Sequence, residues 1–138
     1  MQLNPEFTPL IRLVVATVIG VMIGLERQKN GKIAGIRTFG TLALGTAAIC
    51  IFALKMQGMA NGMEWVIIAS IIIAIGFISA RMFIIDSGNG VQDFSNITAI
   101  WCTAAISILI SFGFYTLGGI TAFLLLLIFL LKDVYEKK

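Results

Sequence analysis

The sequence predicts an all-α integral membrane protein: a bundle of five transmembrane helices with the N-terminus outside and the C-terminus in the cytoplasm. Three observations support this fold class. Hydrophobic residues make up 59% of the 138 residues and charged residues 12%, with a mean hydropathy of +1.00. A soluble domain carries about 25% charged residues. The other two observations are the lengths of the apolar segments and the uneven placement of the basic residues.

The first two helices are predicted over residues 7–25 and 38–56. A helix needs about 20 mostly apolar residues to span a bilayer, and both segments approach that length. Pro9 is suited to the first turn of a helix. The N-terminus has no basic start, and no small-residue cleavage site follows the first apolar segment, so we expect a spanning helix and not a signal peptide.

The remaining helices are predicted over residues 64–85, 96–112 and 118–131. A short turn with two glycines precedes the third helix, and a Gly/Asn-rich segment follows it. Gly113, Gly118 and Gly119 favour a hairpin between the last two helices, whereas the alternative is one long apolar stretch. We expect residues 1–138 to form a single membrane domain without a soluble C-terminal domain.

The basic residues predict the orientation of the bundle. With five spans, eight of the ten basic residues fall on one side of the membrane, and only Arg12 and Lys55 fall on the other. Basic residues are enriched in cytoplasmic loops, so the first loop, the third loop and the C-terminus are predicted to be cytoplasmic. The expected location is the cytoplasmic (inner) membrane of a prokaryote.

Charged residues at two places are candidates for function. Arg12 lies inside the first predicted helix, where a charge is either functional or paired, or else reaches the interface through its long side chain. Glu26 and Arg37 are expected to cap the two helices at the cytoplasmic boundary. A Glu26–Arg37 pair, or a contact of Arg27 with a carbonyl group, would fix this hairpin, and Thr38 belongs to the same boundary cluster.

Small and polar residues recur at helical spacing and allow backbones to approach closely. They serve either packing within the bundle or docking of another protein or a second copy, and a homodimer through the first helix is one expectation. The small residues are Ala16, Gly20, Gly24, Gly45 and Gly76. The polar stripe of the fourth helix contains Asn96, Trp101, Thr103 and Ser107.

Several function classes have little support in the sequence. It contains no histidine, and we find no nucleophile–base pair, phosphate loop or zinc motif, so we expect neither an enzyme nor a cofactor. Asp86 and Asp93 flank a Gly/Asn turn that could hold a hard cation weakly, although a solvated turn is favoured. Cys50 and Cys102 lie in apolar segments and are expected to pack as small hydrophobic residues. The scattered basic residues do not suggest nucleic-acid binding.

Three motifs resemble the N-terminal membrane domain of the MgtC/SapB family. They are GLER (Gly24–Arg27) followed by AGIRT (Ala34–Thr38), LALGTA (Leu42–Ala47), and IWCTAAI (Ile100–Ile106). The resemblance continues at Gly76 in the third helix and covers nearly the whole chain. Arg12 falls where the family often has an arginine.

The resemblance implies an inner-membrane protein linked to magnesium limitation, ion homeostasis and virulence or stress adaptation. It also implies a regulator, since the best-described member binds the membrane-embedded F-type ATP synthase. We therefore expect a non-catalytic regulator that docks on another membrane protein, with the lipid bilayer as its surroundings. The alternative is a magnesium or potassium transporter or channel, working as an oligomer with Asn96, Thr98, Thr103 and Ser107 along its path.

Overall fold

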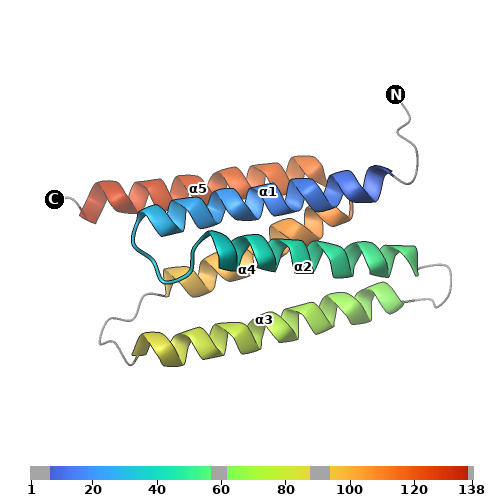
Figure 1. The fold of residues 1–138 in the computed structure, drawn as a ribbon, viewed down its shortest axis with the longest axis horizontal. Coiled ribbons are helices and arrows are strands. Elements are labelled where there is room, and N and C mark those ends of the chain that lie inside the picture. The colour runs from blue at the N-terminus through green and yellow to red at the C-terminus, as the bar shows by residue number, and fades with distance from the viewer. Residues whose placement is uncertain (1–6, 57–61, 88–93, 137–138) are drawn as a thin grey trace.

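The computed structural model describes residues 7–56, 62–87 and 94–136, and the regular structure in these ranges is helical. The helices are α1 (Phe7–Lys29), α2 (Ile36–Lys55), α3 (Met63–Ser87), α4 (Ser95–Ser111) and α5 (Tyr115–Glu136). Consecutive helices run antiparallel, so α1 begins and α5 ends at opposite ends of the bundle (Figure 1). The predicted all-helical bundle is confirmed for the described residues.

The outer surface of the bundle is apolar. Phe77, Trp65 and Phe123 are 74%, 69% and 65% exposed, and soluble monomers rarely expose such large apolar surfaces. Helices α1 and α2, with 23 and 20 residues, are long and apolar enough to cross a bilayer. The apolar parts of the other three helices are shorter within the described residues. These features are consistent with a helical bundle in a membrane.

The helices differ in how completely they are surrounded. The most extensive packing is between α1 and α2, and α4 packs against both of them. Helix α5 lies on α1 and α4, whereas α3 contacts α2 and α4 among the described elements and forms one edge of the bundle (Figure 1). One long side of α3 is therefore left open.

Helix α1 ends one turn later than predicted, at Lys29 and not at residue 25. The hydrophobic run stops there, but Glu, Arg, Gln and Lys are good helix formers and continue the helix. Gly31 then ends it with a φ of 67°, while the amide of Lys32 donates to the carbonyl of Arg27 at 3.1 Å. This is the glycine-based termination common at helix C-termini. As a result, Glu26 and Arg27 are residues of α1 and not of a loop.

A hairpin joins α4 to α5, as the glycines predicted. Gly113 has a φ of 91°, and the amide of Phe114 donates to the carbonyl of Leu109 at 2.9 Å. Gly118 lies inside α5, where a Cβ atom would come within 2.6 Å of Ile110 Cδ1. Its role is close packing on α4 and not a turn, so α5 covers Tyr115–Glu136 and not 118–131. The bounds of α2, α3 and α4 differ from the predicted ones by at most two residues.

Candidate functional site

Arg27 is the most deeply buried charged side chain among the described residues, at 2% exposure. Its Nε and Nη2 atoms donate to Asn96 Oδ1 at 3.4 and 3.3 Å, and Nη2 also donates to Ser95 Oγ. The guanidinium group lies 4.3 Å from the ring centre of Phe129, a distance at which a cation is attracted to the ring face. Arg27 therefore joins the C-terminal turn of α1 to the first turn of α4 and to α5.

The helical register of α1 explains why Arg27 points inward. Gly24 follows Gly20 by four residues and Arg27 follows Gly24 by three, so all three share one helix face. That face is buried along its length. A charge in this position is tolerated only with hydrogen-bond acceptors, and Ser95 and Asn96 supply them.

Glu26 lies beside Arg27 but is partly exposed. Its Oε2 atom is 4.0 Å from Arg27 Nη1, and its Oε1 atom accepts a hydrogen bond from Asn30 Nδ2 at 2.6 Å. Arg37 and Thr38 are exposed on α2. The contacts shown for Glu26 are with Arg27 and Asn30, and the Glu26–Arg37 pair stays a prediction.

Arg12 is paired at the opposite end of the bundle. Its Nη1 atom donates to the carbonyl of Ser111 at 2.9 Å, and its Nε atom donates to Tyr115 Oη at 3.3 Å. A cation at the C-terminus of α4 is also favoured by the helix dipole. Of the two interpretations offered by the sequence, a paired charge describes this arginine, and the pair connects α1 to the α4–α5 hairpin.

Replacing Arg12 by glutamine is expected to lower the free energy of unfolding by about 2 kcal/mol, because the carbonyl of Ser111 loses a charged donor. Thermal unfolding in detergent checks this with a thiol-reactive dye, which reaches the fully buried Cys50 only when the bundle opens. All samples carry Cys102→Ala. The control is Lys55→Gln, an exposed basic residue, and an equal loss in both variants would contradict the pairing.

The polar stripe of α4 is directed into the bundle. The hydroxyls of Thr103, Ser107 and Ser111 donate to carbonyls four residues earlier in α4, at 2.8, 2.9 and 2.7 Å. Ser111 Oγ also lies 3.5 Å from the carbonyl of Ala47 on α2. Asn96 is buried against Arg27, whereas Trp101 is exposed. These hydroxyls are thus hydrogen-bonded within the monomer and serve the packing of α4.

The small residues fall into two groups. Ala16, Gly20 and Gly24 are buried, and the face that they form is covered by α2. A Cβ atom on Gly20 would lie 2.5 Å from Ala43 Cβ, and one on Gly24 would lie 2.7 Å from Ile36 Cα. This face is an intramolecular contact and is not available to a second copy. Gly45 and Gly76 differ, because a Cβ atom on either would meet nothing within 4 Å.

The suggested weak cation site is not covered by the structure. Asp93 lies outside the described residues, and so does the side chain of Asp86 in α3. Among the described residues, no group of three or more His, Cys, Asp or Glu side chains is placed to hold a metal ion.

The sequence did not identify the partners of the two arginines. Ser95 and Phe129 surround Arg27, and Ser111 and Tyr115 surround Arg12. Ser95 is 68 residues from Arg27 and Tyr115 is 103 residues from Arg12, so no local pattern connects them. The available signal was general: an arginine in an apolar helix needs acceptors, and helix ends and hydroxyls provide them.

The fold and the site together define a class: a small, largely apolar helical bundle in which two arginines of α1 contact the two ends of α4. The sequence matches the model of the MgtC family over residues 13–138, and the chain belongs to this family. This confirms the resemblance seen in the motifs.

Curated relatives show the same membership. Protein MgtC of Brucella abortus is 29% identical over 122 residues, covering 88% of this chain and 50% of that protein. "Putative magnesium transporter YhiD" of Escherichia coli is 33% identical, covering 79% and 53%. Protein MgtC of Salmonella typhimurium is 31% identical, covering 78% and 45%. The chain thus spans about half the length of these relatives. No solved structure matches it.

Proposed function

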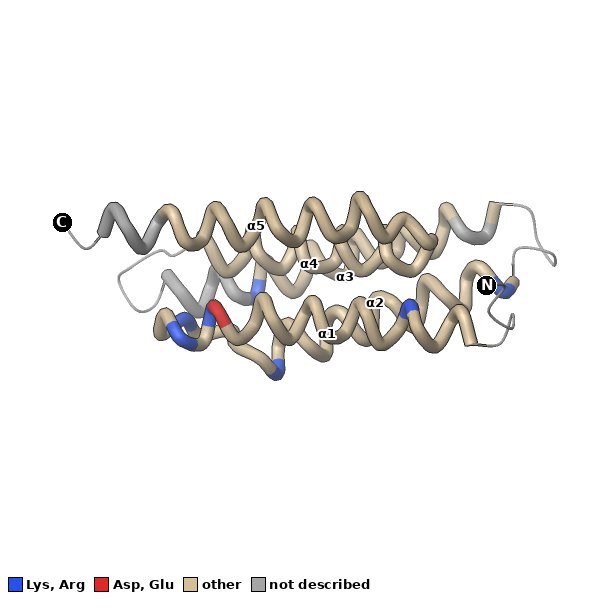
Figure 2. The backbone as a smooth tube through the Cα atoms, turned by 90° about the horizontal axis from the view of Figure 1, so that it is seen from above, with Lys and Arg blue, Asp and Glu red and all other residues tan. Residues whose placement is uncertain are grey.

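We propose that this chain is a non-catalytic regulator of ion homeostasis in the prokaryotic cytoplasmic membrane, acting by docking on another membrane protein such as an F-type ATP synthase. The magnesium-related name of one relative supports the link to ion homeostasis. In the proposed orientation, the end of the bundle where α1 terminates faces the cytoplasm. Lys and Arg gather toward that end, which supports the assignment (Figure 2).

The observation that carries the docking proposal is the open side of α3. The small residues of α1 and the polar stripe of α4 make contacts within this chain. Helix α3, by contrast, has Gly76 and the exposed Ala80 one turn apart. Exposed Phe77 and Ile73 lie on the same helix. A surface that combines small residues with large apolar ones suits a partner helix in a membrane, where close backbone approach drives association.

Replacing Gly76 by leucine is expected to abolish docking without harming the fold, because the side chain would enter open space. The control is Gly119→Leu on α5, where a Cβ atom also meets nothing within 4 Å. The tagged chain is purified in detergent from membranes containing the synthase, and bound synthase is quantified. We expect recovery with the wild type and Gly119→Leu, and at least a tenfold loss with Gly76→Leu.

A second readout is ATP-driven proton pumping in inverted membrane vesicles. Expression of the wild-type chain should reduce pumping, and Gly76→Leu should restore it. Recovery of the synthase by Gly76→Leu at the wild-type level would contradict docking through α3, and failure of the wild type to recover any synthase would contradict this choice of partner.

The alternative is a cation transporter that works as an oligomer, which the printed name of the Escherichia coli relative favours. The hydroxyls of α4 donate within their own helix, so a path along them would require new contacts between copies. Purified chain in liposomes discriminates the two proposals: saturable magnesium or potassium flux would favour transport, and its absence alongside synthase binding would favour regulation.

A further inference from the structure

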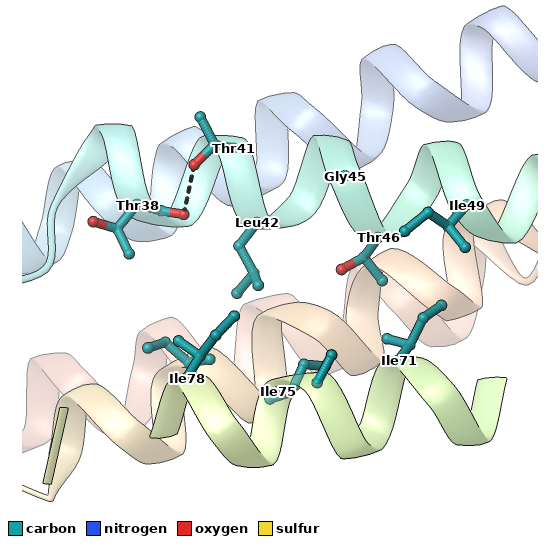
Figure 3. Close-up of a pocket in the computed structure, with 11 residues that line it drawn as sticks. Thr38, Thr41, Leu42, Gly45, Thr46, Ile49, Ile71, Ile75 and Ile78 are labelled. Atoms are coloured by element: carbon teal, nitrogen blue, oxygen red, sulfur yellow. Dashed lines mark hydrogen bonds between the residues drawn. The ribbon is translucent and has the colours of Figure 1, made fainter. Parts of the chain in front are cut away.

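An apolar groove runs between α2 and α3 on the outside of the bundle. Its volume is about 360 Å³, with walls from Thr38 to Ile49 on α2 and from Ile71 to Ile78 on α3, and with Ile100 of α4 among its lining residues. Figure 3 shows side chains of both walls directed toward the gap, with Thr38 and Ile78 at one end and Ile49 and Ile71 at the other. We call this feature the α2–α3 groove.

The length of the groove matches one leaflet of a bilayer. Thr38 and Ile49 are eleven residues apart, which corresponds to about 16 Å at about 1.5 Å per residue. Half of a hydrocarbon core of about 30 Å is about 15 Å. The hydroxyls lie mainly toward the Thr38 end, where Thr41 donates to the carbonyl of Thr38 at 3.2 Å, and the other end is formed by isoleucines.

The groove is long and apolar. It extends over three turns of α2, and aliphatic side chains line both walls, with hydroxyls only at Thr38, Thr41 and Thr46. An extended acyl chain is the occupant that matches an apolar space of this length in a bilayer.

Two exposed arginines mark the Thr38 end of the groove. Neighbouring residues on a helix point about 100° apart. Phe39, directly after Thr38, is buried in the core, so Arg37, directly before it, turns to the outer side. On α3, Ser79 is buried directly after Ile78, and Arg81 lies on the other side and is exposed.

Since α2 and α3 run antiparallel, the start of α2 and the end of α3 lie at the same end of the bundle (Figure 1). Arg37 and Arg81 therefore belong to the same end of the groove. Helix α2 also begins at this end; its N-cap residue, Gly35, has no side chain, and the amide of Ile36 donates to Gln28 Oε1 at 3.4 Å. The partial positive charge of that helix end adds to the charges of Arg37 and Arg81. An anionic group is therefore complementary to this mouth, and a neutral one is not.

We propose that the α2–α3 groove binds an anionic glycerophospholipid, with one acyl chain between the helices and the phosphate held by Arg37 and Arg81. The lipid comes from the leaflet on the side where α1 ends. The proposal rests on the proposed function only in that the bundle lies in a bilayer, and it needs no protein partner. The bound lipid fills the space beside α3 and holds that helix against α2.

Native mass spectrometry of the delipidated chain in a mild detergent tests the proposal. The probes are phosphatidylglycerol and phosphatidylethanolamine with identical acyl chains. We expect the wild type to bind one phosphatidylglycerol at least tenfold more tightly than phosphatidylethanolamine. Arg37→Gln with Arg81→Gln should weaken binding of phosphatidylglycerol by roughly fivefold for each arginine. Lys55→Gln, at the other end of α2, is the charge control and should bind as the wild type does.

A second pair of variants tests the acyl chain. Gly45 lines the groove and has open space beside it, so leucine there would fill the groove without pushing the helices apart. Gly45→Leu should lose both lipids, whereas Gly119→Leu on α5 should keep them. Equal binding of the two lipids by the wild type, an unchanged preference in the double arginine variant, or a dimer that Gly45→Leu dissociates would overturn the proposal. None of these outcomes depends on synthase binding or ion flux.

Discussion

Replacing Arg27 by methionine is expected to lower the free energy of unfolding by about 3 kcal/mol. The substitution keeps most of the volume of the side chain but removes the donors to Ser95 and Asn96 and the cation next to Phe129. Buried polar groups that lose their partner are costly, and those paired with a charge more so. Thermal unfolding in detergent, read by the thiol-reactive dye at Cys50, measures the loss.

Two further variants make this test specific. Arg37→Met removes an arginine from an exposed position and should change stability by less than about 0.5 kcal/mol. Arg27→Lys keeps the charge but not the planar fork that reaches two acceptors, and it should fall between the wild type and Arg27→Met. If Arg27→Met unfolds at the wild-type temperature, Arg27 does not hold the helices together.

The stability of the α1–α2 contact should also be sensitive to the addition of a single methyl group. An alanine Cβ at position 24 would lie 2.7 Å from Ile36 Cα and 2.9 Å from the carbonyl oxygen of Gly35, and one at position 20 would lie 2.7 Å from the carbonyl oxygen of Phe39. These are backbone atoms, so the helices would have to separate. We expect Gly24→Ala and Gly20→Ala to cost about 2 kcal/mol each, as overpacking does.

The matched control is Gly45→Ala. Position 45 lies within α2, and a Cβ atom there would meet nothing within 4 Å, in contrast to positions 20 and 24. Alanine is a better helix former than glycine by up to about 1 kcal/mol, so this variant should be as stable as the wild type or more stable. The same unfolding assay measures all three variants. A destabilised Gly45→Ala together with an unaffected Gly24→Ala would contradict the packing described for α1.

Much of the fold followed from hydropathy, because apolar segments of spanning length and glycine-rich turns are local signals. The ends of α1 and α5 were less predictable. The hydrophobic run of α1 stops at Leu25, but the helix continues to Lys29 because the charged residues that follow have high helix propensity. Contacts of Arg27 with α4 and α5 also stabilise this last turn. The sequence predicts a turn at Gly118, whereas this residue lies inside α5, since a glycine in a sequence does not reveal whether it bends the chain or lets a neighbour approach.

The site was predictable by residue type but not by pairing. Arg12 and Arg27 stood out as charges beside or within apolar helices, and the structure gives both hydrogen-bond partners. The direction in which a side chain turns at a helix end depends on register and on what lies beside it. Arg27 therefore points into the bundle and Arg37 points outward, although both belong to the same GLER…AGIRT motif of the sequence.

The long separation between Arg27 and its acceptors has a consequence for biogenesis. Ser95 is made 68 residues after Arg27, and the ring of Phe129 follows still later. A bare guanidinium group is costly inside lipid, so the newly made α1 must keep its last turn in the headgroup region until α4 arrives. The first two helices therefore enter the membrane before Arg27 can be buried, and α1 reaches its final position only after the last third of the chain has been translated.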